Sequence, residues 1–127
     1  MTTMAPMLDT AYVRFEFDDD VLIATYKKGI TITLDIAKEI VRERIEFTEH
    51  RPVRVLLTDR GVSSFNKAAR DYLASPEGTQ LIKAAAILCE SPATAMIGNF
   101  FVKVSRPSIP VRLFTNRERA IGWLRNK

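Results

Sequence analysis

The chain has 127 residues, of which 46% are apolar and 27% charged, and its net charge is +4. These values are ordinary for a globular protein and argue against disorder, and the length fits one domain with its own core. The single cysteine, Cys89, excludes an internal disulfide framework. No apolar run approaches the roughly 20 residues that cross a bilayer, and the start lacks a signal-peptide pattern, so we expect a cytoplasmic protein.

Residues 11–17 (AYVRFEF) alternate apolar and charged side chains, a pattern that predicts a half-buried strand. An acidic turn at residues 18–20 separates this run from a second β-rich run at 21–27, so we expect an antiparallel hairpin. Residues 30–32 are too short to predict more than an edge strand. Residues 1–10 precede this pattern, and we expect them to form a flexible N-terminal segment.

A first helix is predicted over residues 34–48, where apolar residues recur at helical spacing between charged ones. Thr33 is the expected N-cap, and Asp35 lies in the first turn, where the helix dipole favours an anion. A buried strand at residues 52–58 then leads through a loop into a second helix. The apolar positions of that helix are Phe65, Ala68, Ala69, Tyr72 and Leu73.

Two serine–proline pairs mark helix starts in the next part of the chain, because Ser suits the cap and Pro the first helical position. Ser75 and Pro76 end the second helix and start a short one. Ser91 and Pro92 start a third helix over residues 92–104, after a strand predicted at residues 85–90.

The chain closes with a strand at residues 111–114 and a terminal helix. Thr115 at the cap and Glu118 three residues later form a capping box that opens this helix. Strands that alternate with helices imply right-handed crossovers and a mostly parallel sheet. The predicted fold class is therefore α/β, as one domain over residues 1–127. We expect a mixed five-stranded sheet, with an antiparallel N-terminal hairpin and the remainder mostly parallel, and four main helices.

The order of these elements resembles the STAS domain superfamily, which includes the anti-sigma-factor antagonists. Three stretches, TYKKGITITLDIAKEIVRER, FNKAARDYLASPEG and PVRLFTNRERAIGWL, are similar to the small bacterial SpoIIAA-like proteins of uncharacterised function. The resemblance implies a SpoIIAA-like fold and a bacterial protein with a regulatory or protein-interaction role.

In the anti-sigma antagonists, the loop after the third strand carries a phosphorylatable Ser or Thr, usually preceded by Asp and followed closely by Gly. This chain keeps Gly61 and Val62 at the matching positions. It has Asn66 where those proteins have Asp, Lys67 at the acceptor position and Ala69 at the following Gly. A serine kinase cannot phosphorylate lysine, so the phospho-switch is not carried over.

The strand-loop-helix segment has two interpretations. Backbone N–H groups at a helix start form a ready anion site, which serine hydroxyls and a lysine would complement. The segment does not match the phosphate-binding GxxxxGK[ST] pattern, so a turn with Ser63 or Ser64 as the helix cap explains it more simply. We expect its exposed side chains to form a contact surface. The candidate residues are Asp59, Gly61, Ser63, Ser64, Asn66 and Lys67.

The third predicted helix is apolar over more than half its circumference, which is wider than the stripe of a helix that covers only its own sheet. The apolar side chains that do not cover the sheet would contact something else. The alternatives are the last helix, through Trp123 and Leu124, a second subunit, or an apolar ligand. We prefer a second subunit, in a homodimer. The residues that carry this expectation are Met96, Ile97, Phe100 and Phe101.

Other reactive side chains do not form a catalytic pattern. His50 is the only histidine and lies at a helix end, Cys89 lies within an apolar strand, and the three aspartates at residues 18–20 lack the spacing of a calcium loop. Glu39 and Glu43 share a helical face, as many solvated pairs do. We name no catalytic residue, no metal ligand and no cofactor.

These observations favour a non-enzymatic protein-interaction or regulatory module with an unidentified protein partner. The alternative is a small-molecule or lipid-binding protein with an apolar cavity under the third helix, since related folds include lipid-transfer proteins. The basic residues are scattered and not interleaved with aromatic ones, so we expect no nucleic-acid partner.

Overall fold

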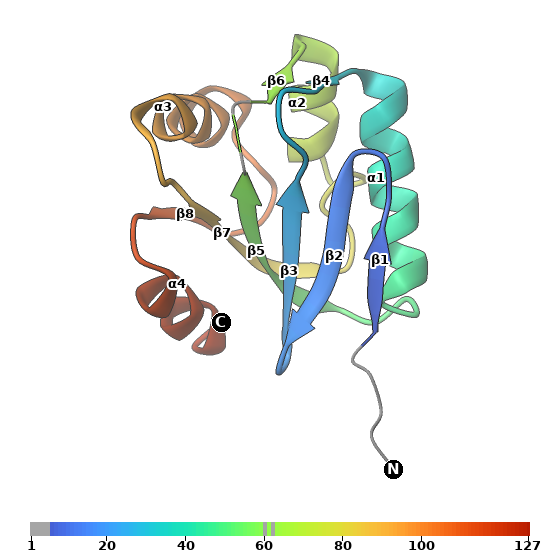
Figure 1. Ribbon diagram of the computed structural model, residues 1–127, viewed down its shortest axis with the longest axis vertical. Coiled ribbons are helices and arrows are strands. Elements are labelled where there is room, and N and C mark those ends of the chain that lie inside the picture. Colours follow the sequence, from blue (N-terminus) through green and yellow to red (C-terminus); the bar gives the residue numbers. More distant parts are fainter. Residues whose placement is uncertain (1–5, 60, 62) are drawn as a thin grey trace.

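The computed structural model describes residues 6–59, 61 and 63–127, which form a mixed sheet covered by helices on both faces (Figure 1). The strand order is β1-β2-β3-β5-β7-β8. The first three strands pair antiparallel, and β3, β5, β7 and β8 pair parallel. The strands are β1 (Met7–Asp9), β2 (Val13–Asp18), β3 (Val21–Tyr26), β5 (Val53–Asp59), β7 (Ile82–Leu88) and β8 (Val111–Phe114).

The described residues also form four α-helices and one short π-helix. They are α1 (Leu34–Phe47), α2 (Lys67–Ala74), α3 (Pro92–Phe100), the π-helix η1 (Phe101–Ser105) and α4 (Arg117–Arg125). Two short strands, β4 (Thr31–Ile32) and β6 (Ser64–Phe65), form a separate parallel pair. The predicted α/β class, the antiparallel N-terminal hairpin and the four main helices are confirmed.

The inner strands are buried on both faces, so the sheet divides the core in two. On β3, Leu22 and Ala24 pack with α1 and α2, whereas Val21 and Ile23 pack with α4. Strand β7 follows the same alternation, because successive side chains of a strand point to opposite faces. Its Ala85 joins the α1–α2 side, and its neighbours Ala84 and Ala86 join the α4 side.

The acidic turn between β2 and β3 is held by arginines that are distant in sequence. Asp18 accepts from Arg117 at 3.3 Å, and Asp19 accepts from Arg125 at 3.1 Å. Asp20 lies 3.8 Å from Arg54. The turn therefore connects the hairpin to α4 and β5, although exposed pairs of this kind each stabilise a fold by at most about 1 kcal/mol.

Within the part of the chain that the structure describes, the sheet has six strands, where the sequence predicted five. The additional strand, β1, lies within the N-terminal segment expected to be flexible, and residues 1–5 of that segment lie outside the described residues. A three-residue strand is too short to show a period of two. Its pairing with β2, from Met7 opposite Glu16 to Asp9 opposite Arg14, and the ion pair of Asp9 with Lys27 fix it in the sheet.

Three local predictions were wrong. The short helix after Pro76 is a run of turns. The third helix changes to a π-helix at Phe101, whose carbonyl accepts from Arg106 N at 3.2 Å, five residues on. Asn116, not Thr115, caps α4 by accepting from Arg119 N. The predicted caps Thr33 and Ser91 are confirmed.

Candidate functional site

The loop after β5 is a turn closed by the carboxylate of Asp59. This carboxylate accepts from the backbone N–H groups of Gly61 at 2.9 Å and of Ser63 at 3.3 Å. Ser63 has no exposed surface, and its hydroxyl donates to the Lys27 carbonyl at 2.9 Å. The expectation that Ser63 is exposed was therefore wrong; Val62 lies outside the described residues.

The rest of the predicted contact surface belongs to β6 and the start of α2. Ser64 is exposed and lies with its hydroxyl 3.1 Å from that of Thr31. Asn66 caps α2 by accepting from Ala69 N at 2.9 Å, so neither Ser63 nor Ser64 is the cap. Exposed Lys67 pairs with Asp71 one turn later, at 2.6 Å. Ser64, Asn66 and Lys67 are thus the exposed members of the predicted set.

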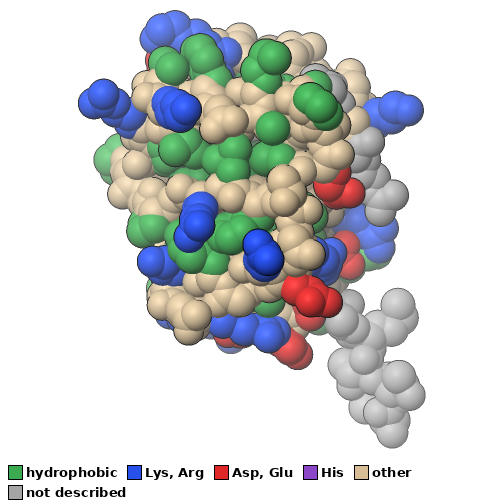
Figure 2. Space-filling view, turned by 90° about the vertical axis from the view of Figure 1, so that its left-hand side faces the viewer, with side chains coloured by type: hydrophobic (Ala, Val, Ile, Leu, Met, Phe, Trp, Pro, Cys, Tyr) green, Lys and Arg blue, Asp and Glu red, His purple; other side chains and the backbone are tan. Residues whose placement is uncertain are grey.

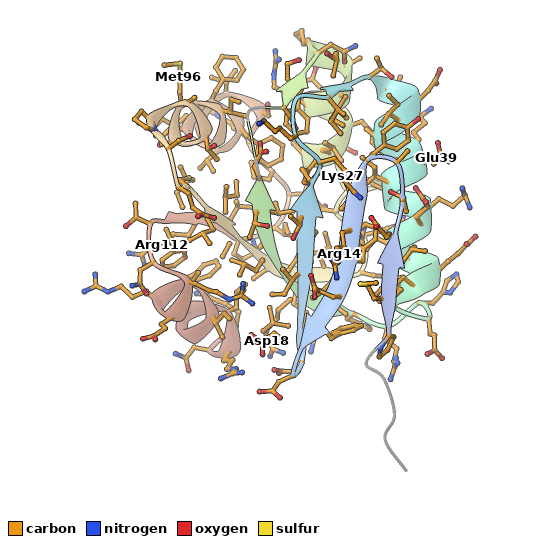
Figure 3. The ribbon with its side chains drawn as sticks, viewed as in Figure 1. Arg14, Asp18, Lys27, Glu39, Met96 and Arg112 are labelled. Carbon is orange, nitrogen blue, oxygen red and sulfur yellow. The ribbon has the colours of Figure 1, made fainter. Side chains whose placement is uncertain are left out.

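The apolar residues of the third predicted helix divide into two groups. Ile97 and Phe101 face inward and line a cavity. Met96 and Phe100 are 72% and 43% exposed, and Met96 points away from the sheet (Figure 3). The expected contact with Trp123 does not form this surface, because Trp123 packs beside Phe114 on the α4 side of the sheet, with ring centroids 5.7 Å apart.

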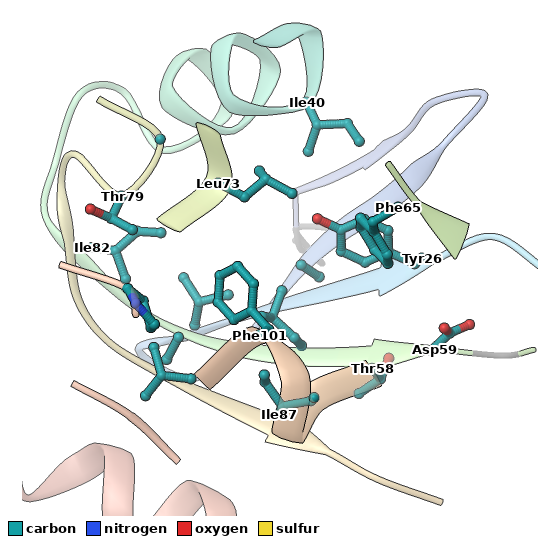
Figure 4. Close-up of a pocket in the computed structure, with 18 of the residues that line it drawn as sticks. Tyr26, Ile40, Thr58, Asp59, Phe65, Leu73, Thr79, Ile82, Ile87 and Phe101 are labelled. Carbon is teal, nitrogen blue, oxygen red and sulfur yellow. The ribbon is translucent and has the colours of Figure 1, made fainter. Parts of the chain in front are cut away.

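The cavity has a volume of about 160 Å³ and lies between the sheet and the layer formed by α1, α2, α3 and η1 (Figure 4). Alanines at 24 and 85, on β3 and β7, form part of its floor. Space remains above them because their side chains end at Cβ. The surrounding walls are aromatic and aliphatic, and include Tyr26, Phe65, Leu73, Ile87 and Phe101.

One charged side chain of this lining is buried in the protein. Arg44 of α1 is 4% exposed, and its Nη2 donates to the Gly78 carbonyl at 3.4 Å. Its Nη1 is enclosed and has no hydrogen-bond partner among the described residues. Burial lowers the pKa of Arg44 to about 10, which still leaves the guanidinium protonated at neutral pH.

The cavity also has a phenol group. In Figure 4 the Tyr26 hydroxyl points from β3 toward Leu73. Burial raises the pKa of Tyr26 to about 12, with the Asp59 carboxylate acting in the same direction and Arg44 in the opposite one. The phenol is therefore protonated at neutral pH and available as a hydrogen-bond donor.

Arg44 was not predicted as a site residue, although its spacing from the apolar residues of α1 indicates an inward position. The buried residues of α1 are Ala37, Ile40, Val41 and Arg44, so the arginine falls seven, four and three residues after apolar positions. That spacing places it on the inward face of the helix. An arginine inside an apolar stripe is a buried charge and therefore a candidate for binding.

A second hollow is polar and lies near the carboxyl ends of β5 and β7. Its lining includes Asp59, Glu90, Ser91 and Arg117. Within residues 6–59, 61 and 63–127, no cluster of three or more His, Cys, Asp or Glu side chains could hold a metal ion. In that same part of the chain, no helix is long and apolar enough to cross a membrane.

The two remaining candidates from the sequence lie outside the cavity. Cys89 is buried after β7, and burial raises the pKa of its thiol, which favours the protonated, unreactive form. His50 is exposed and follows α1 with a positive φ of 60°. Neither residue is part of the cavity lining.

Comparisons with known proteins identify the family and the fold. The chain belongs to the family described as "Domain of unknown function (DUF7793)", whose model matches residues 15–127. Among solved structures, it is similar to an uncharacterized protein of the DUF3478 family, with a SpoIIAA-like fold, from Shewanella loihica PV-4. The two share 12% sequence identity over 98% of each chain, with a TM-score of 0.56. The search of curated proteins found no match. The SpoIIAA-like fold that the resemblance implied is confirmed.

Proposed function

We propose that this chain is a non-enzymatic binding module whose ligand is a small, largely apolar molecule held in the cavity beneath α3 and η1. The observation that carries the proposal is the cavity itself, with its volume of about 160 Å³ and its aromatic and aliphatic walls. Protein interiors are close-packed, and empty spaces of this size are few in any domain. A site lined mainly by apolar groups with a few polar ones is the usual form of a ligand pocket.

The volume limits the size of the ligand. An engineered apolar cavity of about 150 Å³ binds benzene, so this cavity accommodates a group of about that size. Pockets for drug-sized molecules are larger, at roughly 300–1,000 Å³. The proposed ligand therefore presents one ring or one short branched chain to the cavity.

A ligand can reach this space past a single layer of side chains. Phe65, Leu73, Ile97 and Phe101 line the cavity and are only half-buried themselves. Two of them lie on α3 and η1, where the change from α- to π-helix alters the hydrogen-bond register. The cavity is itself partly open to solvent, so a ligand can enter it without unfolding of the sheet.

The test uses 2-phenylethanol, a neutral molecule with one aromatic ring, titrated into the protein while methyl NMR signals are followed. The expected result is saturable shifts at Leu73 and Ile87, which line the cavity. An Ala85→Leu variant adds three carbons to the cavity floor and should lose this binding. Met96→Ala is the matched control, because Met96 lies on the outer side of α3. Equal binding by Ala85→Leu and wild type would contradict the proposal.

A protein interface is the second candidate function, and the outer side of α3 and η1 favours it. Met96 is 72% exposed and Val104 60%, while Phe100 is 43% exposed with the Arg70 guanidinium 4.7 Å from its ring centroid. Figure 2 shows apolar side chains grouped on the molecular face that carries α3, β8 and α4, with Lys and Arg between them.

The expected occupant of this second surface is another copy of the chain. Sedimentation velocity over a concentration series should then show a dimer that Met96→Asp converts to monomer; a monomer at every concentration would refute it. The exposed Ser64, Asn66 and Lys67 form a further proposed contact surface, for a protein partner.

A further inference from the structure

The buried guanidinium of Arg44 lacks a negative partner. None of the carboxylates in the described part of the chain lies within 4.0 Å of it. Its neighbour on α1, Arg42, is exposed and pairs with Glu46 at 3.3 Å and with Glu39 at 3.7 Å. The buried arginine of this helix is thus unpaired, and the exposed one is paired.

An unpaired buried charge opposes folding, because water solvates the ion better than the protein interior does. Within the described residues, the Arg44 side chain makes one hydrogen bond, to the Gly78 carbonyl, and that bond is long at 3.4 Å. If position 44 served stability alone, an apolar residue of similar length would stabilise the fold more than an arginine with an unpaired charge. The enclosed Nη1 of Arg44 has no hydrogen-bond partner among the described residues, and a ligand in the cavity can supply one.

We propose that the cavity ligand carries a carboxylate and that Arg44 is the residue that binds it. This inference rests on the proposed function and names the chemical class of the ligand. The planar guanidinium matches the geometry of a carboxylate, and hydrogen bonds between charged groups are the strong ones. The Tyr26 hydroxyl supplies a second donor at the same cavity.

The charges of the lining favour a single negative charge. Among the described residues, three charged ones contribute to it: Arg44, Arg70 and Asp59. The Asp59 carboxylate is already held by backbone N–H groups of its own turn. The Arg70 guanidinium lies against the exposed Phe100 ring, so Arg44 is the buried charge of the described lining, and a monocarboxylate neutralises it. A phosphate with two negative charges would leave an excess charge in an apolar space, at a cost in free energy.

The test compares two probes that share the same ring: phenylacetate, which carries a carboxylate, and 2-phenylethanol, which is neutral. Isothermal titration calorimetry at pH 7 gives the dissociation constants for wild type and for Arg44→Met. The variant should bind phenylacetate about 10- to 100-fold more weakly, the loss expected for one charge-assisted hydrogen bond. Its affinity for 2-phenylethanol should change little. Arg42→Met is the control on the exposed side of α1 and should bind both probes as wild type does.

A second readout separates binding from structure. Without ligand, Arg44→Met should unfold at a temperature equal to or above that of wild type, because it removes an unpaired buried charge. Phenylacetate should raise the unfolding temperature of wild type more than that of the variant. If Arg44→Met does not fold, Arg44→Gln replaces it in both measurements.

The possible outcomes distinguish this inference from the proposed function. Binding of 2-phenylethanol, with phenylacetate bound no more tightly to wild type than to Arg44→Met, would overturn the inference and leave the proposed function standing. Failure of both probes to bind would overturn both. Arg44-dependent binding of phenylacetate supports both.

Discussion

Replacing Ala85 by leucine should stabilise the protein. Ala85 lies on β7 with its side chain in the cavity floor, and the space above it has a volume of about 160 Å³. The substitution adds three carbons, which is half the number in the benzene ring that a comparable cavity holds. At about 0.8 kcal/mol per buried carbon, the gain in the free energy of unfolding has a ceiling of about 2.4 kcal/mol.

Some of this gain is lost to side-chain entropy and strain, so we expect about 1–2 kcal/mol. For a domain of this size, that corresponds to a rise of roughly 4–8 °C in the unfolding temperature. The matched control is Ala86→Leu, on the next residue of the same strand. Ala86 is fully buried against the α4 side of the sheet, in the core that contains Ala120 and Leu124.

The assay is urea unfolding of both variants, followed by circular dichroism. Ala86→Leu adds the same three carbons to a packed region and should lose about 1–3 kcal/mol through overpacking. Strand propensity changes equally in the two variants, so the difference between them reports the space at each site. Equal losses in both would show that the region above Ala85 is packed, and would refute the cavity.

Three further predictions concern the surroundings of the cavity. Gly78→Ala should destabilise by about 2 kcal/mol or more, because its Cβ would lie 2.0 Å from the Tyr72 carbonyl oxygen; an unchanged urea midpoint would contradict this contact. Asn66→Ala should lose about 1 kcal/mol in the same assay through loss of the α2 cap, whereas Ser64→Ala should lose little, and the reverse order would restore Ser64 as the cap. The Tyr26 phenol has a pKa raised to about 12 in the folded state, so its contribution to stability is complete below pH 10 and is lost between pH 10 and 12. Between pH 10 and 12, the free energy of unfolding of Tyr26→Phe should therefore fall less than that of wild type. Urea unfolding at several pH values measures this difference, and parallel pH profiles would contradict the raised pKa of Tyr26.

The fold could be predicted because its signals are local. The alternation in β2, the acidic turn after it and the helical spacing in α1 each depend on residues close in sequence. The caps of α2 and α4 could not be chosen so easily. Each helix start has several residues that can cap a helix. For α2, strand β6 extends to Phe65 and leaves Asn66 as the cap.

The candidate site depends on contacts that sequence spacing does not contain. The sequence shows that the third helix is apolar over a wide surface, but the division of this surface into inward Ile97 and outward Met96 follows from how α3 lies on the sheet. The cavity exists because two alanines on separate strands face the same helices. Arg44 was the exception, since its place in the α1 stripe could be found from spacing alone.

We expect the cavity to bind an apolar carboxylate through Arg44. A crystal structure of the protein grown with phenylacetate tests it most directly. We expect the ring to lie between Leu73, Ile87 and Phe101, with a carboxylate oxygen about 2.7–3.2 Å from Nη1 of Arg44. An empty cavity at a phenylacetate concentration that saturates the protein in solution, or a ligand bound on the outer side of α3 beside Met96, would contradict it.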